Sequence, residues 1–284
     1  MIIDAHQHFW MYDAHRDSWI NEDMAALRRD FLPEHLLGEL QSNNVDGCIA
    51  VQVDQSEAET SFLLQVADRY QEVQGVVGWV DLRCPNLKER LQYFSEFKKL
   101  RGFRHIVQSE PDDRFLLRDD FCQGIEQLGR FHFTYDILVY PPQLPAAIEL
   151  VRRFPQQAFV IDHIAKPFIR RGELEPWATH MREISSNANV WCKLSGLVTE
   201  AAWGQWNAAD FDPYFDVVLK SFGPDRLMFG SDWPVCLLSG SYSQVKQLVT
   251  EAVAHLTPEE QAKIFGLNAV AFYGLEKPIA WTCS

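Results

Sequence analysis

The sequence predicts an α/β protein, a (β/α)8 TIM barrel, from three observations. Eight short apolar segments alternate with amphipathic helical patterns along the 284 residues. No low-complexity linker or change of composition divides the chain. The turns between apolar and helical segments lack the glycine-rich phosphate-binding motifs of open, doubly wound sheets. We therefore expect a single domain over residues 1–284.

Each predicted strand is a run of mostly apolar residues, as expected for a parallel sheet that is covered on both faces. The first strand starts at Ile2 and Ile3 and contains His6 and His8. We expect the other seven strands at residues 45–53, 76–80, 102–107, 131–139, 158–163, 189–194 and 226–232.

The predicted helices carry recognisable start signals. Pro33 suits the first turn of a helix, and Ser56 with Glu59 forms a capping-box pattern. The polar segment 11–32 is long for a connection, which is typical of a functional lid. We expect helices at residues 33–40, 56–70, 86–99, 119–129, 143–154, 176–186, 211–222, 242–256 and 258–272.

Composition excludes several classes of partner. The formal net charge of −13 argues against binding to nucleic acid or to an anionic membrane surface. No apolar run approaches the roughly 18 residues of a membrane span, and no signal-peptide pattern is present, so a cytoplasmic location is expected. The six cysteines form no C-x-x-C pair, which indicates reduced thiols and not a zinc ribbon or a disulfide scaffold.

Two histidines in the first strand are candidate functional residues. His6 and His8 are two positions apart, so they project from the same face of a strand. Such a pair can hold a divalent metal or polarise a carbonyl oxygen; alternatively, it simply closes the strand with polar residues. His163 and Asp232 end the sixth and eighth predicted strands. Since active sites of such barrels lie at the carboxyl ends of the strands, we expect all four residues around one mouth.

Three stretches, in order along the chain, resemble motifs of the amidohydrolase superfamily: residues 3–8 (IDAHQH), 162–167 (DHIAKP) and 229–234 (FGSDWP). More narrowly, the chain resembles the sugar lactonases of the L-fuconolactonase and L-rhamnonolactonase type, which are related to 2-pyrone-4,6-dicarboxylate lactonase. The resemblance implies a TIM barrel, with Asp232 as the general base. It also implies that His6, His8 and His163 surround the carbonyl under attack.

The resemblance has a departure that concerns the metal. Binuclear members of the superfamily usually place a bridging lysine or glutamate on strand four and a histidine on strand five. Here strand four offers Arg104 and His105, and strand five reads Thr134, Tyr135 and Asp136. We therefore expect either no metal or one divalent ion, Zn²⁺ or Mn²⁺. Its candidate ligands are His6, His8, His163 and Asp232.

Three further residues are candidates for substrate binding. Arg104 could bind a hydroxyl, carboxylate or carbonyl, or instead form a structural ion pair with Glu110 or Asp112. Lys166 could contact the substrate or remain ion-paired. Trp10 follows His8 directly, and we expect its ring to stack on a sugar ring, although tryptophans in such loops also pack against one another.

These features fit the hydrolysis of a lactone. A carboxylate beside a water can act as a general base, an effect of roughly 10²–10⁴-fold, while imidazoles or one metal stabilise the oxyanion. We expect a sugar-degrading enzyme that opens an aldonolactone, such as L-fuconolactone or L-rhamnonolactone, to the aldonic acid. The alternatives are a lactonase for a carboxylated pyrone or muconolactone, a metal-dependent decarboxylase of the same superfamily, and a non-catalytic sugar-acid-binding protein. The oligomeric state, including a homo-oligomer, stays open.

Overall fold

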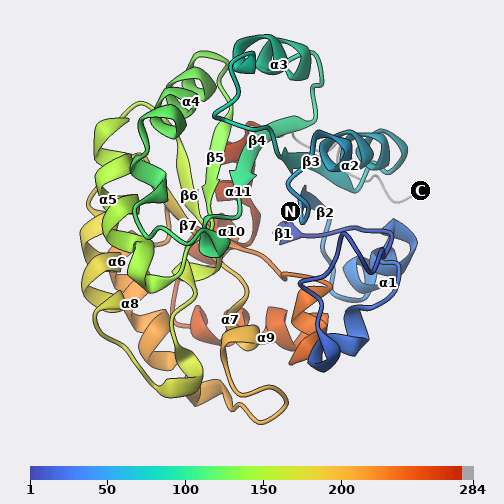
Figure 1. The fold of residues 1–284 in the computed structure, drawn as a ribbon. Coiled ribbons are helices and arrows are strands. Elements are labelled where there is room, and N and C mark those ends of the chain that lie inside the picture. The colour runs from blue at the N-terminus through green and yellow to red at the C-terminus, as the bar shows by residue number, and fades with distance from the viewer. Residues whose placement is uncertain (277–284) are drawn as a thin grey trace.

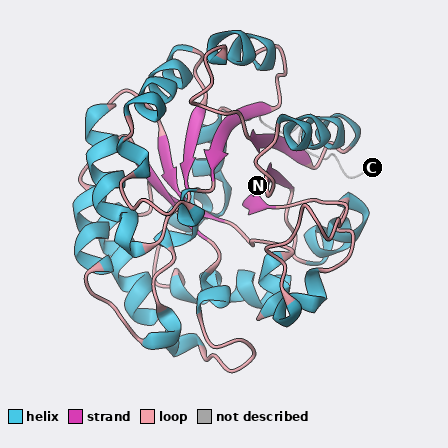
Figure 2. Cartoon of the chain, in the orientation of Figure 1, coloured by secondary structure: helices cyan, strands magenta, loops and turns pink. Residues whose placement is uncertain are grey.

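Eight parallel strands form one sheet in the order of the sequence, from β1 to β8. The computed structural model describes residues 1–276, and Cys283 lies outside them. Figure 1 and Figure 2 show the strands surrounded by helices. The strands are β1 (Ile3–Gln7), β2 (Gly47–Val51), β3 (Val73–Gly78), β4 (Leu100–His105), β5 (Thr134–Ile137), β6 (Phe159–Ile161), β7 (Val190–Leu194) and β8 (Leu227–Phe229).

The sheet closes between its first and last strands. Gln7 forms a parallel bridge with Trp233, beyond the end of β8. The backbone N–H of His8 donates to the carbonyl of Trp233 at 2.7 Å, and that of Asp232 donates to the carbonyl of His6 at 2.8 Å. The predicted (β/α)8 barrel is therefore confirmed.

Most helices lie near their predicted positions outside the barrel (Figure 1). The short helix Leu197–Glu200 was not predicted, and a π-helical turn, Lys263–Leu267, divides the helix predicted at residues 258–272. The α-helices are α1 (Pro33–Ser42), α2 (Glu57–Arg69), α3 (Leu87–Phe94), α4 (Asp119–Arg130), α5 (Leu144–Arg153), α6 (Trp177–Ser185), α7 (Leu197–Glu200), α8 (Asp212–Phe222), α9 (Tyr242–Ala252), α10 (Pro258–Ala262) and α11 (Asn268–Tyr273). No helix within residues 1–276 is long and apolar enough to cross a membrane. That the whole chain to Ser284 forms one domain stays a prediction.

The Ser56–Glu59 pattern forms only half of the expected capping box. Ser56 Oγ accepts a hydrogen bond from the backbone N–H of Glu59 at 3.2 Å, as predicted. The Glu59 carboxylate, however, accepts from the backbone N–H of Val53 at 3.3 Å. Glu59 therefore fastens the segment after β2 to the start of α2.

Strand β1 contains an irregularity that shapes the mouth of the barrel. Its pairing register with β2 shifts between Asp4 and Gln7, which is the signature of a β-bulge. Ala5 packs in the small cluster that contains Val160 and Met228, yet the next residue, His6, also faces inward. The bulge allows two consecutive residues to point into the barrel.

Asp4 lies behind the mouth and fixes the two ends of the sheet together. Its buried carboxylate accepts hydrogen bonds from the backbone N–H of Ser231 at 2.9 Å and from the hydroxyl of Tyr242 at 3.0 Å. It also accepts from the backbone N–H of His6 at 3.1 Å. Since Ser231 precedes Asp232, these bonds set the position of Asp232 relative to β1.

Candidate active site

The four residues expected at one mouth do meet there. Asp232 Oδ1 lies 3.2 Å from His8 Nε2, 3.8 Å from His163 Nε2 and 3.9 Å from His6 Nε2. The His6 ring centroid is 4.9 Å from that of His8 and 4.3 Å from that of His163. All four side chains are buried. Residues separated by more than 200 positions thus form one cluster of three imidazoles around a carboxylate.

His163 and Asp232 do not lie within strands, although both were predicted at strand ends. β6 ends at Ile161 and β8 at Phe229. Both residues have positive φ angles, 53° for His163 and 58° for Asp232, which are unusual outside glycine. Strained conformations of this kind concentrate at functional sites. These turns direct both side chains across the mouth toward β1.

The Nδ1 atoms of His8 and His163 each have a hydrogen-bond partner in the surrounding protein. His8 Nδ1 lies 2.7 Å from the carbonyl oxygen of Val51, and His163 Nδ1 lies 2.9 Å from Ser195 Oγ. A carbonyl only accepts, so His8 Nδ1 carries the proton of this bond. Next to Ser195, Gly196 leaves room for His163, because a Cβ at Gly196 would lie 2.5 Å from His163 Nδ1. Each Nε2 is thereby directed toward Asp232.

His6 belongs to a second, fully buried network of charges below the mouth. Its Nδ1 lies 3.1 Å from Lys193 Nζ and 3.3 Å from Asp162 Oδ1, and its Nε2 lies 3.2 Å from Arg104 Nη1. Lys193 Nζ also pairs with Asp136 at 2.5 Å and with Asp162 at 2.9 Å. Two cations and two carboxylates therefore compensate one another inside the barrel.

The protonation states follow from burial and from these neighbours. Burial lowers the pKa of His163 to about 4 and that of His6 well below its usual value, so both imidazoles are neutral at pH 7. Burial alone would raise the pKa of Asp232, but His163, His8 and His6 outweigh it and bring the pKa below its usual value. Asp232 is thus a carboxylate, ready to accept a proton or to bind a cation.

The donor set fits one divalent metal ion. Zinc binds nitrogen or oxygen at about 2.0–2.1 Å, which separates tetrahedral ligands by about 3.4 Å, close to the 3.2–3.9 Å found around Asp232 Oδ1. Metal-binding histidines usually donate their other N–H to a carbonyl or carboxylate, as His8 does to Val51. Arg104 competes at His6 Nε2, so the set of His6, His8 and Asp232 can hold an ion only when Arg104 withdraws.

The described residues do not offer the ligands of a second ion. Within residues 1–276, the groups of at least three candidate ligands are His6–His8–Asp232 and His6–Asp162–His163, and they share His6. Asp136 and Asp162 already bind the ammonium group of Lys193. On strand five, Asp136 is paired with Lys193, and on strand four, Arg104 is paired with Asp162.

A cavity of about 320 Å³ opens above this cluster. Asp232, His8 and His163 form its floor, and the segments that follow β2, β4 and β6 form much of its wall. The predicted lid segment 11–32 also contributes. The wall residues are Arg16, Trp19, Val53, Asp54, Gln55, Arg104, Ile106, Gln108, Ser109, Leu138, Lys166 and Val235.

Two of the three predicted substrate contacts line this cavity. Arg104 lines it and forms an ion pair with Asp162 at 3.0 Å. The alternative prediction, an ion pair with Glu110 or Asp112, is therefore wrong. Glu110 instead pairs with His105 at 2.6 Å, on the outer side of the sheet. Lys166 lines the cavity and pairs with Glu200 at 3.0 Å, so it is both ion-paired and accessible to a ligand.

Trp10 does not reach the cavity, contrary to its predicted role. It is only 1% exposed, packs against Phe31 and donates its indole N–H to the carbonyl of Arg29 at 3.0 Å. Trp19, 40% exposed, lies against Trp10 and lines the cavity in its place. The segment 11–32 folds back over Trp10 and buries it. The sequence alone does not show which of Trp10 and Trp19 is buried.

Lys193, Asp136 and Asp162 were not predicted as parts of the site. Each is fully buried and lies in or directly after an apolar strand. A charged residue inside such a strand is itself a signal, because lysine and aspartate are rarely buried unless they are paired. Such residues in β5 and β7 and directly after β6 indicate buried ion pairs, although the pattern alone does not show which residues pair.

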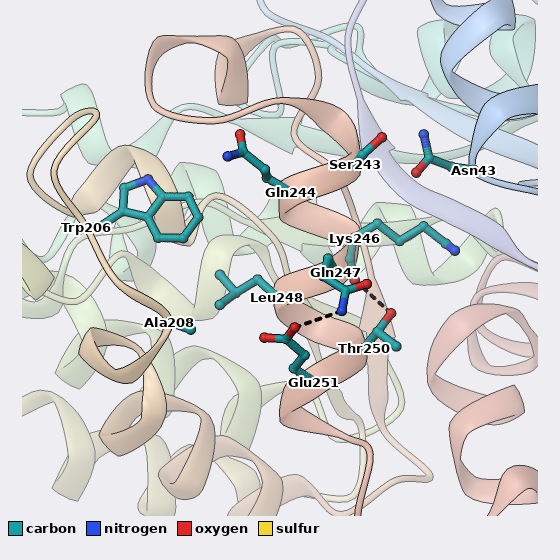
Figure 3. Close-up of a pocket in the computed structure, with 10 residues that line it drawn as sticks. All are labelled: Asn43, Trp206, Ala208, Ser243, Gln244, Lys246, Gln247, Leu248, Thr250 and Glu251. Carbon is teal, nitrogen blue, oxygen red and sulfur yellow. Dashed lines mark hydrogen bonds between the residues drawn. The ribbon is translucent and has the colours of Figure 1, made fainter.

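A second hollow lies on the outer surface along α9 (Figure 3). Its volume is about 440 Å³, and its wall includes Trp206, Lys246 and Glu251. Gln247 donates to Glu251 at 2.7 Å, and Thr250 donates to the carbonyl of Lys246 at 2.8 Å. None of the predicted site residues lies in its wall, so we assign the chemistry to the mouth of the barrel.

Comparison with known proteins agrees with this architecture. A family model described as amidohydrolase matches residues 3–275. The chain is 41% identical to an L-fucono-1,5-lactonase of Burkholderia multivorans over 97% of both chains, and 36% identical to one of Burkholderia ambifaria over 97% of this chain and 96% of the relative. A crystal structure of an amidohydrolase from Burkholderia multivorans with bound zinc superposes with a TM-score of 0.93 at 40% identity, covering 97% of this chain and 100% of that one. The chain belongs to the amidohydrolase family.

Proposed function

We propose that this protein hydrolyses an uncharged lactone of a six-carbon sugar to the aldonic acid, with Asp232 as the general base. The observation that carries the proposal is the ionised Asp232 at the floor of a cavity, within 3.9 Å of three imidazole nitrogens. The similarity to L-fucono-1,5-lactonases supports the substrate class. L-Fuconolactone and L-rhamnonolactone are the first candidates.

The reaction needs few steps. Asp232 removes a proton from a water, and the water oxygen forms a bond to the carbonyl carbon of the lactone. The tetrahedral oxyanion then re-forms the carbonyl and breaks the ring C–O bond. The proton held by Asp232 passes to the leaving alkoxide, which leaves a carboxylic acid that loses its own proton to solvent. A general base of this kind contributes about 10²–10⁴-fold to the rate.

Neighbouring donors stabilise the oxyanion. The hydroxyl of Ser195 can donate to His163 Nδ1, and neutral His163 then presents Nε2–H to the cavity. Arg104 lines the same cavity and carries a permanent positive charge. Donors that are fixed before the reaction stabilise developing charge more effectively than mobile water does.

A single divalent ion, Zn²⁺ or Mn²⁺, is compatible with this site. His6, His8 and Asp232 would hold it if Arg104 withdraws from His6 Nε2, and His163 would be a further ligand in its other tautomer. Bound there, it would act as a Lewis acid on the carbonyl oxygen. The residues of this chain still supply the proton transfers and the orientation of the ring.

The charges of the cavity favour an uncharged substrate. Its three cations are already paired: Arg104 with Asp162, Lys166 with Glu200, and Arg16 with Asp17. Asp54 and Asp232 add negative charge to the wall and floor. A dicarboxylated pyrone needs several converging cations, and it would have to displace these internal partners. This argues against the pyrone and muconolactone alternatives.

A screen of aldonolactones with a pH indicator, run with and without chelator, tests the proposal. Acid release from L-fucono- or L-rhamnonolactone above the spontaneous rate is the expected result. Release of CO2 from an aromatic acid, abolished by chelator, would identify a decarboxylase instead. Binding of aldonic acids without turnover of any lactone would identify a non-catalytic binding protein. The chelator series also tells whether an ion is required.

We further propose that the enzyme works in a reducing compartment such as the cytoplasm. Five of its cysteines are free thiols, and Cys48, Cys192 and Cys236 are buried. Burial raises the pKa of all three thiols, so they are inert packing residues and not nucleophiles.

A further inference from the structure

Two side chains in the cavity wall have a buried polar atom without a partner within residues 1–276, namely Arg104 at Nε and Gln108 at Oε1. Gln108 lies in the 3-10 turn Val107–Ser109 (η2), just beyond the end of β4. Its side-chain Oε1 is buried and accepts no hydrogen bond within residues 1–276. Buried amide oxygens are nearly always hydrogen-bonded, so an orphan in a substrate cavity calls for a donor from the ligand.

The backbone around Gln108 is rigidly held. Its own N–H donates to the carbonyl of Leu138 at 3.0 Å. Gln143 Nε2 donates to the carbonyl of Val107 at 2.8 Å, and the N–H of Ile106 donates to Gln55 Oε1 at 2.8 Å. Such bonds from three separate elements fix the backbone that carries Gln108 before any substrate arrives.

The other long polar side chains of the wall are already engaged. The Gln55 oxygen accepts from Ile106, Lys166 binds Glu200, and Arg104 binds Asp162. Gln108 thus provides a neutral acceptor that has no competing protein donor. A hydroxyl group of a sugar lactone is a neutral donor of matching size.

We propose that Gln108 is a specificity-determining residue that accepts a hydrogen bond from one ring hydroxyl of the lactone. The inference rests on the proposed function and deepens it, because it explains how the site distinguishes a polyhydroxylated ring from a bare one. A site built to bind a hydroxyl discriminates against an analogue that lacks it, since its buried polar group then stays unpaired. An interaction of this kind changes affinity by about 10-fold.

The test measures binding of unreactive lactams, separately from turnover. Dissociation constants for a polyhydroxylated δ-lactam, its monodeoxy analogues and unsubstituted δ-valerolactam are compared by calorimetry for wild type, Gln108→Met and Gln108→Leu. Both substitutions remove the acceptor and keep an unbranched or compact apolar side chain. We expect about 10-fold weaker binding of the polyhydroxylated lactam and of all but one monodeoxy analogue. That one analogue and δ-valerolactam should bind wild type and variants equally.

Gln157→Met is the matched control. Gln157 also has a buried, unpartnered Oε1, but it donates to the carbonyls of Phe133 and Ala158 at the start of β6, at the opposite end of the barrel. It should leave every lactam affinity unchanged. Equal loss for all ligands in both Gln108 variants, or no loss for any, would overturn the role of Gln108. If wild type binds no hydroxylated lactam and turns over no sugar lactone, the proposed function itself fails.

Discussion

Replacing Lys193 with methionine should lower the free energy of unfolding, because it removes the ammonium group that links the buried carboxylates Asp136 and Asp162. Lys193 is fully buried, and its Nζ lies 2.5 Å from Asp136, 2.9 Å from Asp162 and 3.1 Å from His6 Nδ1. Methionine fills similar space without charge. Asp162 still pairs with Arg104 at 3.0 Å, but among residues 1–276 Asp136 then retains only the hydroxyl of Tyr273, at 2.9 Å.

Breaking a buried ion pair on one side costs about 3–5 kcal/mol, because a charge is left without its partner. The free energy of unfolding of Lys193→Met should therefore fall by about this amount in urea, with an unchanged m-value. A double variant, Lys193→Met with Asp136→Leu, removes both partners and should recover part of the loss.

The defect should also depend on pH. Burial raises the pKa of Asp136 to about 6 even beside Lys193. A carboxyl whose folded pKa exceeds its unfolded value of 3.8 costs stability increasingly as pH rises through that interval. Without Lys193 the folded pKa rises further, so Lys193→Met should be less destabilised at pH 5 than at pH 8. A loss below about 1 kcal/mol at pH 8, or a loss independent of pH, would show that Lys193 does not compensate a buried charge on Asp136.

Three further predictions follow from single features. Elemental analysis of protein purified without added metal should give at most about one equivalent of Zn²⁺ or Mn²⁺, and a reproducible two equivalents would contradict the single site. Trp19→Ala should lower kcat/KM for sugar lactones by about 10-fold, because the partly exposed ring lines the cavity. The free energy of unfolding should change by under about 1 kcal/mol. Unchanged kinetics would show that Trp19 does not contact the substrate. Burial raises the pKa of Glu59 from 4.5 to about 7, so its ionisation costs stability as pH rises across that range. Glu59→Gln should therefore raise the melting temperature at pH 8 relative to wild type and lose this advantage near pH 4.5, and the opposite trend would show that Glu59 is stabilised as an anion.

The sequence predicted the barrel because its signal is repeated eight times. Each apolar strand and each helix start is a local feature, and closure of the sheet then places all strand ends at one mouth. His6, His8, His163 and Asp232 were predicted in the same way, since they lie at or just beyond the ends of the first, sixth and eighth strands. Their convergence around Asp232 needed no information beyond chain order.

The rest depended on contacts that no local pattern contains. The bulge in β1 turns His6 inward beside Ala5, and it arises from pairing with β2 and with the segment after β8. The burial of Trp10 depends on how the lid packs against Phe31. The ion pairs of Lys193 with Asp136 and Asp162 form only because the barrel brings β5, β7 and the segment after β6 together. Long-range packing decided all three cases.

The most direct test of the account compares wild type with Asp232→Asn on L-fucono-1,5-lactone. Asparagine keeps the shape of the side chain and removes its basicity, so the water loses its proton acceptor. We predict that kcat/KM falls by about 10²-fold or more, while thermal unfolding confirms a folded variant. A properly folded Asp232→Asn enzyme that retains nearly full activity would contradict the central claim that this carboxylate activates the water.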